Sequence, residues 1–224
     1  MGGPCRLHVE GQHRKSSAPP CTDNFQVRSF NFDGAEYFSC EQAYQASKFS
    51  KKQDRESIRQ IRPLRDETDS SHGMRCWSEG QRHEIRNDFD ACKILIMLNV
   101  NRAKYSQHED LREELLSTGN STISGSPSTS WRYNGQDHNW SKWNGLIQMI
   151  IREEIKPPQE VQMEMIKELY DEVDNYHRID NRSCGIFSSL NETPVLKEEG
   201  VGVEGAAEEK ETNSTIDSIG EKTN

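Results

Sequence analysis

The sequence predicts an α+β fold, a compact and mostly helical single domain with a small β-hairpin near its N-terminus. Three observations support this prediction. Asp33-Gly34 lies between two short β-prone runs, the pattern of a tight hairpin turn. Apolar residues at helical spacing fill most of the chain between this turn and residue 176. The length of 224 residues suits one ordinary domain with appendages, and a hydrophobic content of only 32% places part of the chain outside the core.

The predicted hairpin leads into a helix within the stretch FDGAEYFSCEQAYQASKF. Phenylalanines and a valine precede Asp33-Gly34, and aromatic residues come after it, so each side of the turn suits a strand. Ser39, with Gln42 three residues later, fits a capping box that starts a helix. We therefore expect a helix over residues 40–49 and a second helix from Asp54.

Three further helices are expected downstream. Residues 89–105 are apolar on several sides, which indicates a buried central helix. A shorter helix at 111–116 should end before Gly119, a residue suited to the left-handed turn after a helix. A polar loop over 119–138 and an apolar helix over 143–155 complete the predicted domain.

We divide the chain into four parts. The N-terminal part has no apolar period, and the C-terminal part has no aromatic residue from Ser188 onward and carries nine acidic and three basic side chains there. Between the domain and the tail, apolar residues at helical spacing indicate an amphipathic helix that docks on the domain or, alternatively, on a protein partner. The parts are a flexible leader (1–21), the domain (22–157), the amphipathic helix (158–176, with the partner surface at 159–176) and a mostly disordered acidic tail (177–224).

Glu41, Gln45 and Lys48 share one face of the first predicted helix. Two interpretations remain open, a solvated helix face or a functional site. The helix dipole at the first turn predicts a lowered pKa for Glu41. Such a carboxylate is a poor general acid but a good electrostatic partner for developing positive charge.

Two other features suggest a ligand. The segment from Lys48 to Arg65 carries a net charge of +5, which suits a phosphate or pyrophosphate, although a solvated surface or ion pairs with the acidic tail explain it as well. The loop that contains Trp131, Trp140 and Trp143 offers aromatic rings that stack on a base or fill the core.

Several function classes find no support in the sequence. No run approaches the roughly 20 apolar residues of a membrane span, and no signal peptide is visible, so we expect an intracellular protein, cytoplasmic or nuclear. The cysteines lack the spacing of a zinc site, and we expect neither a metal nor a cofactor. Nucleophile elbows, Walker loops and dinucleotide-binding glycine patterns are absent from the sequence.

Three ordered segments resemble the NADAR family, the YbiA-like N-glycosidases. The first is NFQVRSFNFDGAEYFSCEQAYQASKF, similar to the family's SNF, DG turn and ExxxQxxKF helix. The second, KYSQHEDLREELLSTG, resembles the family's KFxQNxxLxxxLLxTG. The third, WNGLIQMIIREEI, is similar to its GxxLMxVREEL helix. Together the segments cover about residues 22–156.

The resemblance implies metal-independent hydrolysis of an N-glycosidic bond in an ADP-ribosyl or phosphoribosyl compound, either free or carried on nucleic acid. It also implies that a helix glutamate, a tryptophan and an aspartate are functional. The alternative is a catalytically impaired module that binds ADP-ribose or another nucleotide. We expect Glu41 to be catalytic, and the substrate-binding residues to be Asn24, Phe25, Gln45, Lys48, Phe89, Trp131 and Asn144.

The sequence departs from the family pattern at two of these functional positions. Phe89 occupies the place of the family's tryptophan, and Trp77 could substitute for it if the intervening segment folds back. Ser128 occupies the place of an acidic residue, and Asp137 in the same loop is a replacement candidate. These departures are the reason for the binding-module alternative.

Overall fold

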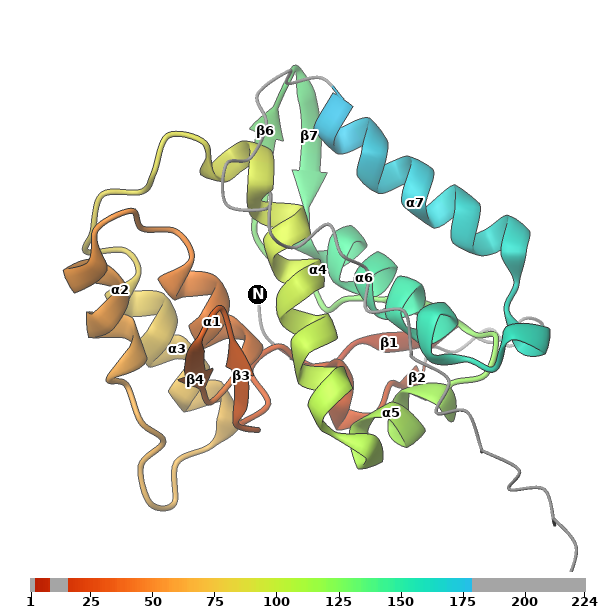
Figure 1. Ribbon diagram of the computed structural model, residues 1–224, viewed down its shortest axis with the longest axis horizontal. Helices are drawn as coiled ribbons and strands as arrows, with labels where there is room; N and C mark the ends of the chain where they lie inside the picture. Colours follow the sequence, from red (N-terminus) through yellow and green to blue (C-terminus); the bar gives the residue numbers. More distant parts are fainter. Residues whose placement is uncertain (1–2, 9–15, 179–224) are drawn as a thin grey trace, which may run out of the picture. The chain divides into compact units, whose positions relative to one another are not determined.

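The computed structural model describes residues 3–8 and 16–178 (Figure 1). All described residues belong to one compact unit within Met1–Gly185. Residues 179–224, most of the predicted acidic tail, lie outside the described residues.

The described part is an α+β fold that combines seven α-helices with three small antiparallel sheets. One sheet has the strand order β2-β1-β5, and the other two are the hairpins β3-β4 and β6-β7. Helix α4 runs through the middle, with α1, α2 and α3 on one side and α6 and α7 on the other (Figure 1). The elements are β1 (Arg6–His8), β2 (Ser16–Ser17), β3 (Phe30–Phe32), β4 (Ala35–Tyr37), α1 (Cys40–Ala46), α2 (Lys52–Arg59), α3 (Asp69–Glu79), α4 (Phe89–Gln107), α5 (Glu109–Leu116), β5 (Thr122–Ser124), β6 (Ser130–Tyr133), β7 (Gln136–Asn139), α6 (Trp140–Ile155) and α7 (Met163–Arg178), with short 3-10 turns at Pro20–Thr22 and Pro158–Glu160.

The β3-β4 hairpin turns where the sequence predicts. Asp33 and Gly34 have φ angles of 49° and 70°, and both angles lie in the left-handed region that a two-residue hairpin turn requires. Phe30 then pairs with Tyr37, and both side chains are buried. The predicted hairpin is confirmed.

Helix α1 begins at the predicted cap. The Ser39 hydroxyl accepts a hydrogen bond from the Gln42 backbone N–H at 3.2 Å. The Gln42 side chain reaches back one residue further than expected and accepts from the Phe38 N–H at 2.7 Å. The first bond satisfies a backbone donor that a helix start leaves unpaired, and the second holds the residue before the cap. The helix ends at Ala46, three residues before the predicted boundary.

Helix α4 is the buried central helix that the sequence predicts. Ile94, Ile96 and Met97 are all buried although they point in different directions around the helix. Packing on several sides explains this, because α4 contacts helices α1, α5, α6 and α7 as well as strand β3. No helix of the described residues is long and apolar enough to cross a membrane.

The structure corrects the expected flexible leader (1–21). Strand β1 pairs with β5, so that Leu7 lies opposite Ile123, and β2 pairs with β1 on its other edge. Cys5 and Cys21 are buried. The pairing joins segments more than 100 residues apart, and a three-residue strand has no period of its own to reveal it. The predicted polar loop over 119–138 likewise contains β5, β6 and β7.

Helix α3 was not expected, because its buried face consists of His72, Gly73 and Cys76 rather than large apolar residues. Gly73 is required there by close packing. A Cβ atom at this position would lie 2.3 Å from the Phe25 ring. Phe25, one of the predicted substrate-binding residues, therefore packs on the backbone of α3.

The C-terminal amphipathic helix docks on the domain, as expected. Helix α7 packs against α4 and α6, and Val173 and Tyr176 are each 3% exposed. The Tyr170 hydroxyl accepts a hydrogen bond from Arg102 of α4 at 2.9 Å. A protein partner for the outer face of this helix remains a prediction.

Candidate active site

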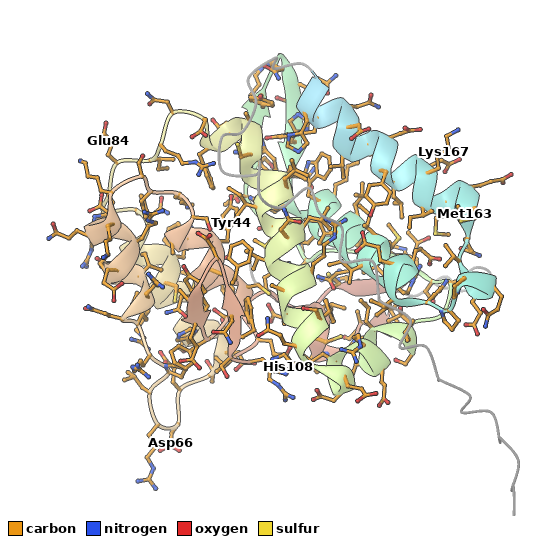
Figure 2. All side chains as sticks on the ribbon, viewed as in Figure 1. Tyr44, Asp66, Glu84, His108, Met163 and Lys167 are labelled. Atoms are coloured by element: carbon orange, nitrogen blue, oxygen red, sulfur yellow. The ribbon has the colours of Figure 1, made fainter. Side chains whose placement is uncertain are left out.

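A pocket of about 490 Å³ opens between α1, α3, the start of α4, β6 and the start of α6. Tyr44 lies between α1 and α4 (Figure 2), with its ring centroid 5.4 Å from that of Phe89. The wall contains both aromatic and charged side chains. The pocket is lined by Tyr44, Gln45, Lys48, Trp77, Gln81, Ile85, Arg86, Asn87, Phe89, Asp90, Lys93, Thr129, Ser130, Trp131 and Trp140.

The pocket brings together four of the residues predicted from the sequence. Gln45 lines it from α1, Lys48 from just after the end of α1, Phe89 from α4 and Trp131 from β6. Glu41 lies one helical turn before Gln45 and is fully buried, outside the residues that form the wall. The shared face of α1 is thus a buried face that leads from the core into the pocket, and the solvated-face interpretation is wrong.

Asn24 and Asn144 support this face from behind. The Asn24 side-chain amide donates to Asn144 Oδ1 at 3.0 Å, and Asn101 donates to Asn24 Oδ1 at 3.0 Å. The backbone carbonyl of Asn24 accepts from the N–H of Glu41 at 2.9 Å. Neither Asn24 nor Asn144 lines the pocket, and their observed contacts hold the start of α1 in place.

Glu41 is tied to Gln45. The Gln45 side-chain amide donates to Glu41 Oε1 at 2.5 Å, while Glu41 Oε2 has no hydrogen-bond partner among the described residues. Gly80, at the end of α3, makes room for this arrangement. A Cβ atom on Gly80 would lie 2.1 Å from Gln45 Oε1.

Burial raises the pKa of Glu41, although the hydrogen bond from Gln45 and the charge of Lys48 oppose the shift. The lowered pKa expected from the helix dipole is therefore wrong. A helix end stabilises a charge by about 0.3–1 kcal/mol, whereas taking an ion out of water costs several kcal/mol. Desolvation is the larger effect, so this carboxyl group holds its proton to a higher pH than a solvated glutamate.

Three cationic side chains line the pocket. Lys48 is 7% exposed and Lys93 is equally buried. Burial lowers the pKa of both lysines, and the charges of Glu41 at Lys48 and Asp90 at Lys93 oppose this effect. Lys93 Nζ lies 2.6 Å from Asp90 Oδ1 and 4.2 Å from the centroid of the Trp131 ring.

Arg86 is the third cation, and its guanidinium group has nitrogen atoms that lack a hydrogen-bond partner among the described residues. Its side chain is 6% exposed, and its Nε lies 2.9 Å from Asp88 Oδ1. That approach lacks hydrogen-bonding geometry, and neither Nε nor Nη2 has a hydrogen-bond partner among the described residues. Burial lowers the pKa of Arg86, and Asp88 opposes the shift. A buried guanidinium with open N–H groups at a pocket wall is suited to an anionic ligand.

The aromatic residues of the pocket show whether Trp77 lies near Phe89, which occupies the place of the family's tryptophan. Trp77 of α3 lines the same pocket as Phe89, so the segment between them does fold back. Trp131 and Trp140 supply further walls, with ring centroids 5.2 Å apart. The pocket therefore has tryptophan surfaces, although none of them occupies the position of Phe89.

The positively charged segment from Lys48 to Arg65 contributes only Lys48 to the pocket. Arg59 and Arg62 lie over the rings of Tyr37 and Phe38 instead, with separations of 5.7 and 5.5 Å. The sequence reasoning thus missed Arg86 and Lys93. Lys93 lies four residues after Phe89, on the same face of a helix, and this spacing was an available signal. Arg86 precedes α4, so helical spacing does not relate it to Phe89.

Asp137 does not replace the missing acid. Its side chain is 79% exposed on β7 and pairs with Arg132 at 3.2 Å. Neither Asp137 nor Ser128 lines the pocket, whereas Asp90, next to Phe89, does. Among residues 3–8 and 16–178, no cluster of three His, Cys, Asp or Glu side chains is placed to hold a metal ion.

Comparison with known proteins supports the relationship that the motifs suggest. A model of the NADAR domain matches residues 8–156. The N-glycosidase Npun_R5314 of Nostoc punctiforme is 28% identical over 137 residues, which are 61% of this chain and 85% of the relative. The NMR structure of the E. coli protein YbiA is similar to this chain with a TM-score of 0.48 and 26% identity, over 60% of this chain and 77% of that protein.

Proposed function

Because this chain belongs to the NADAR domain family, we propose that it is an N-glycosidase that hydrolyses the N-glycosidic bond of an ADP-ribosyl or phosphoribosyl compound. The observation that carries the proposal is the composition of the pocket, which is lined by three buried cationic side chains and three tryptophans. A phosphorylated ribosyl compound has both a strong anion and a flat base, and the pocket offers a surface for each.

The anion is assigned to the cations. Arg86 lines the pocket and has two nitrogen atoms without a hydrogen-bond partner among the described residues, and a guanidinium suits the geometry of phosphate oxygens. Lys48 and Lys93 add compact positive charges. Because all three side chains are largely withdrawn from water, their attraction for an anion is screened less than on the surface.

The leaving base is assigned to the aromatic walls. Trp77, Trp131 and Trp140 present ring surfaces to the pocket, and a base that stacks on an aromatic ring gains about 1–3 kcal/mol. Stacking on rings tolerates different bases. The identity of the base therefore depends on polar groups at the wall, of which Gln81 and Asn87 are candidates.

The reaction requires a group that manages a proton. As the bond between C1′ and the base nitrogen breaks, its electron pair leaves with the base and positive charge develops on the ribose. Water then attacks C1′ and must lose a proton, and we assign Glu41 as the acceptor. Its raised pKa makes it a stronger base than a solvated carboxylate, and Oε2 is open to accept the proton. The leaving base takes up a proton from solvent water, and Glu41 afterwards releases its proton to solvent, so the net reaction is the addition of one water molecule.

One observation favours a second candidate, a module that binds ADP-ribose or another nucleotide without cleaving it. Glu41 stands behind Gln45 rather than at the pocket wall. Catalysis therefore requires Gln45 to move aside or a water molecule to connect the carboxylate with the ribose. A binding module requires neither.

The substitution Glu41→Gln separates the two candidates. The purified protein is incubated with NAD, ADP-ribosylated guanosine in DNA, and phosphoribosylated aminopyrimidines, and the released base is measured by chromatography. We expect wild-type turnover and a loss of about 100-fold or more in kcat for Glu41→Gln, the usual contribution of a general base. Glu36→Gln, on the exposed side of β4, is the matched control and should keep full activity. Equal activity of wild type and Glu41→Gln contradicts the catalytic assignment. Ligand binding without turnover supports the binding module.

A further inference from the structure

Helix α7 lies beyond residues 8–156, the part of the chain that the NADAR domain model matches. Its C-terminal end nevertheless lies beside the β6-β7 hairpin (Figure 1), which contributes Trp131 to the pocket. Tyr176 of α7 makes contacts with the pocket wall at this end of the helix.

The hydroxyl of Tyr176 joins two residues of the pocket wall. It donates to the backbone carbonyl of Asp90 at 2.6 Å and accepts from the indole Nε1–H of Trp131 at 3.2 Å. Asp90 belongs to the first turn of α4 and Trp131 to β6. One oxygen atom therefore links two elements that both contribute residues to the pocket wall.

The ring of Tyr176 is enclosed by other aromatic rings. Its centroid lies 4.9 Å from those of Tyr133 and His138 on the hairpin, and 5.3 Å from that of Trp143 on α6. The residue is only 3% exposed. A side chain fixed by so many rings places its hydroxyl accurately, so it can restrict the positions of its two partners.

The same contacts extend to a cation of the pocket. Lys93 lies over the Trp131 ring and pairs with the Asp90 carboxylate. The residues form a closed set in which Tyr176 orients Trp131 and Asp90, and these two residues hold Lys93. A change at Tyr176 should therefore alter both the aromatic wall and one of the cations.

We propose that Tyr176 is a positioning residue of the pocket, through which helix α7 holds Trp131 and the start of α4 in their ligand-binding arrangement. Tyr176 does not itself line the pocket. The choice of ADP-ribose as the probe rests on the proposed function. The positioning role of Tyr176 rests on its contacts and does not depend on that function.

The first test needs no ligand. In a protein labelled with ¹⁵N-tryptophan, the indole resonance of Trp131 is identified by its loss in Trp131→Phe. Tyr176→Phe keeps the ring and removes only the hydroxyl, so we expect this resonance to shift clearly. Tyr170→Phe is the matched control, since Tyr170 loses the same atom from the same helix but bonds Arg102 and Glu154, away from the pocket. It should leave the resonance unchanged.

The second test measures the affinity of the full chain for ADP-ribose by calorimetry. We expect Tyr176→Phe to raise the dissociation constant about 3- to 10-fold, because a net hydrogen bond contributes about that much to an equilibrium. Tyr170→Phe should stay within about twofold of wild type. In a Trp131→Phe background the effect of Tyr176→Phe should shrink, since the two residues act through one contact.

An unmoved Trp131 resonance in Tyr176→Phe overturns the proposal. So does unchanged ADP-ribose affinity in a folded Tyr176→Phe protein, or an equal loss in Tyr170→Phe. If the wild-type chain neither binds ADP-ribose nor releases a base, the proposed function fails, and the resonance alone decides the role of Tyr176.

Discussion

A substitution of Arg86 tests directly whether the pocket binds an anion. The substitution Arg86→Met keeps most of the side-chain volume and removes a buried positive charge whose Nε and Nη2 have no hydrogen-bond partner in the described part of the chain. If the pocket holds an anion, this arginine stabilises the complex at the expense of the free protein. The substitution should therefore affect ligand affinity and folding stability in opposite directions.

The magnitudes depend on the contacts of the guanidinium. A hydrogen bond to a charged group contributes about 1.5–3 kcal/mol, so losing one such bond to the ligand should raise its dissociation constant about 10- to 100-fold. Leaving a buried donor unsatisfied costs about 1–3 kcal/mol in the free protein. The pairing of Nε with Asp88 offsets part of that cost. We therefore expect the free energy of unfolding of Arg86→Met to equal that of wild type or exceed it by up to about 2 kcal/mol.

Urea denaturation measures the stability, and calorimetry with ADP-ribose and with inorganic pyrophosphate measures the affinity. Arg82→Met is the control, because Arg82 is 70% exposed, pairs with Glu79 and does not line the pocket. It should change neither quantity appreciably. A large loss of stability in Arg86→Met together with unchanged affinity would refute the reasoning, since Arg86 would then be a structural residue.

Two further predictions concern the environment of Glu41. Burial raises its pKa, so the native state keeps a proton that the unfolded chain, with an ordinary value of 4.5, loses. This stabilisation is present below 4.5 and is lost as the pH rises through the native pKa, so Glu41→Gln should be more stable than wild type near about pH 8 but not near about pH 4. Urea denaturation at both pH values measures this, and equal differences would contradict it. Gly80→Ala suits the backbone, with φ of −64°, but displaces Gln45, so we expect kcat to fall at least about tenfold while circular dichroism stays native. A fully active Gly80→Ala enzyme would show that the bond between Gln45 and Glu41 is dispensable.

Local elements of the fold were predictable because short stretches of sequence encode them. The Asp33-Gly34 turn depends on two residues that tolerate the left-handed backbone, and the start of α1 depends on Ser39 and Gln42. Helix α4 is recognisable in the sequence because it carries apolar residues on several of its sides. Strand β1 and helix α3 were missed, because a three-residue strand and a helix buried through His72, Gly73 and Cys76 acquire their form from distant partners.

The candidate site, like the fold, was predictable only in the features that depend on local sequence. Helical spacing alone puts Glu41, Gln45 and Lys48 on one face, and the motif resemblance assigns the family. It does not reveal that the face is buried, and burial reverses the expected direction of the pKa of Glu41. Desolvation depends on everything packed around a group, whereas the helix dipole depends only on its own helix.

The sequence by itself determined the family, the hairpin, the main helices and the face that carries Glu41. Only the tertiary structure decided that Trp77 joins Phe89 in one pocket, that Arg86 and Lys93 supply its cations, and that Tyr176 holds its wall. The physical reason is distance along the chain. Spacing rules act over a few residues, whereas a pocket is assembled by contacts between segments tens of residues apart, whose packing no local pattern specifies.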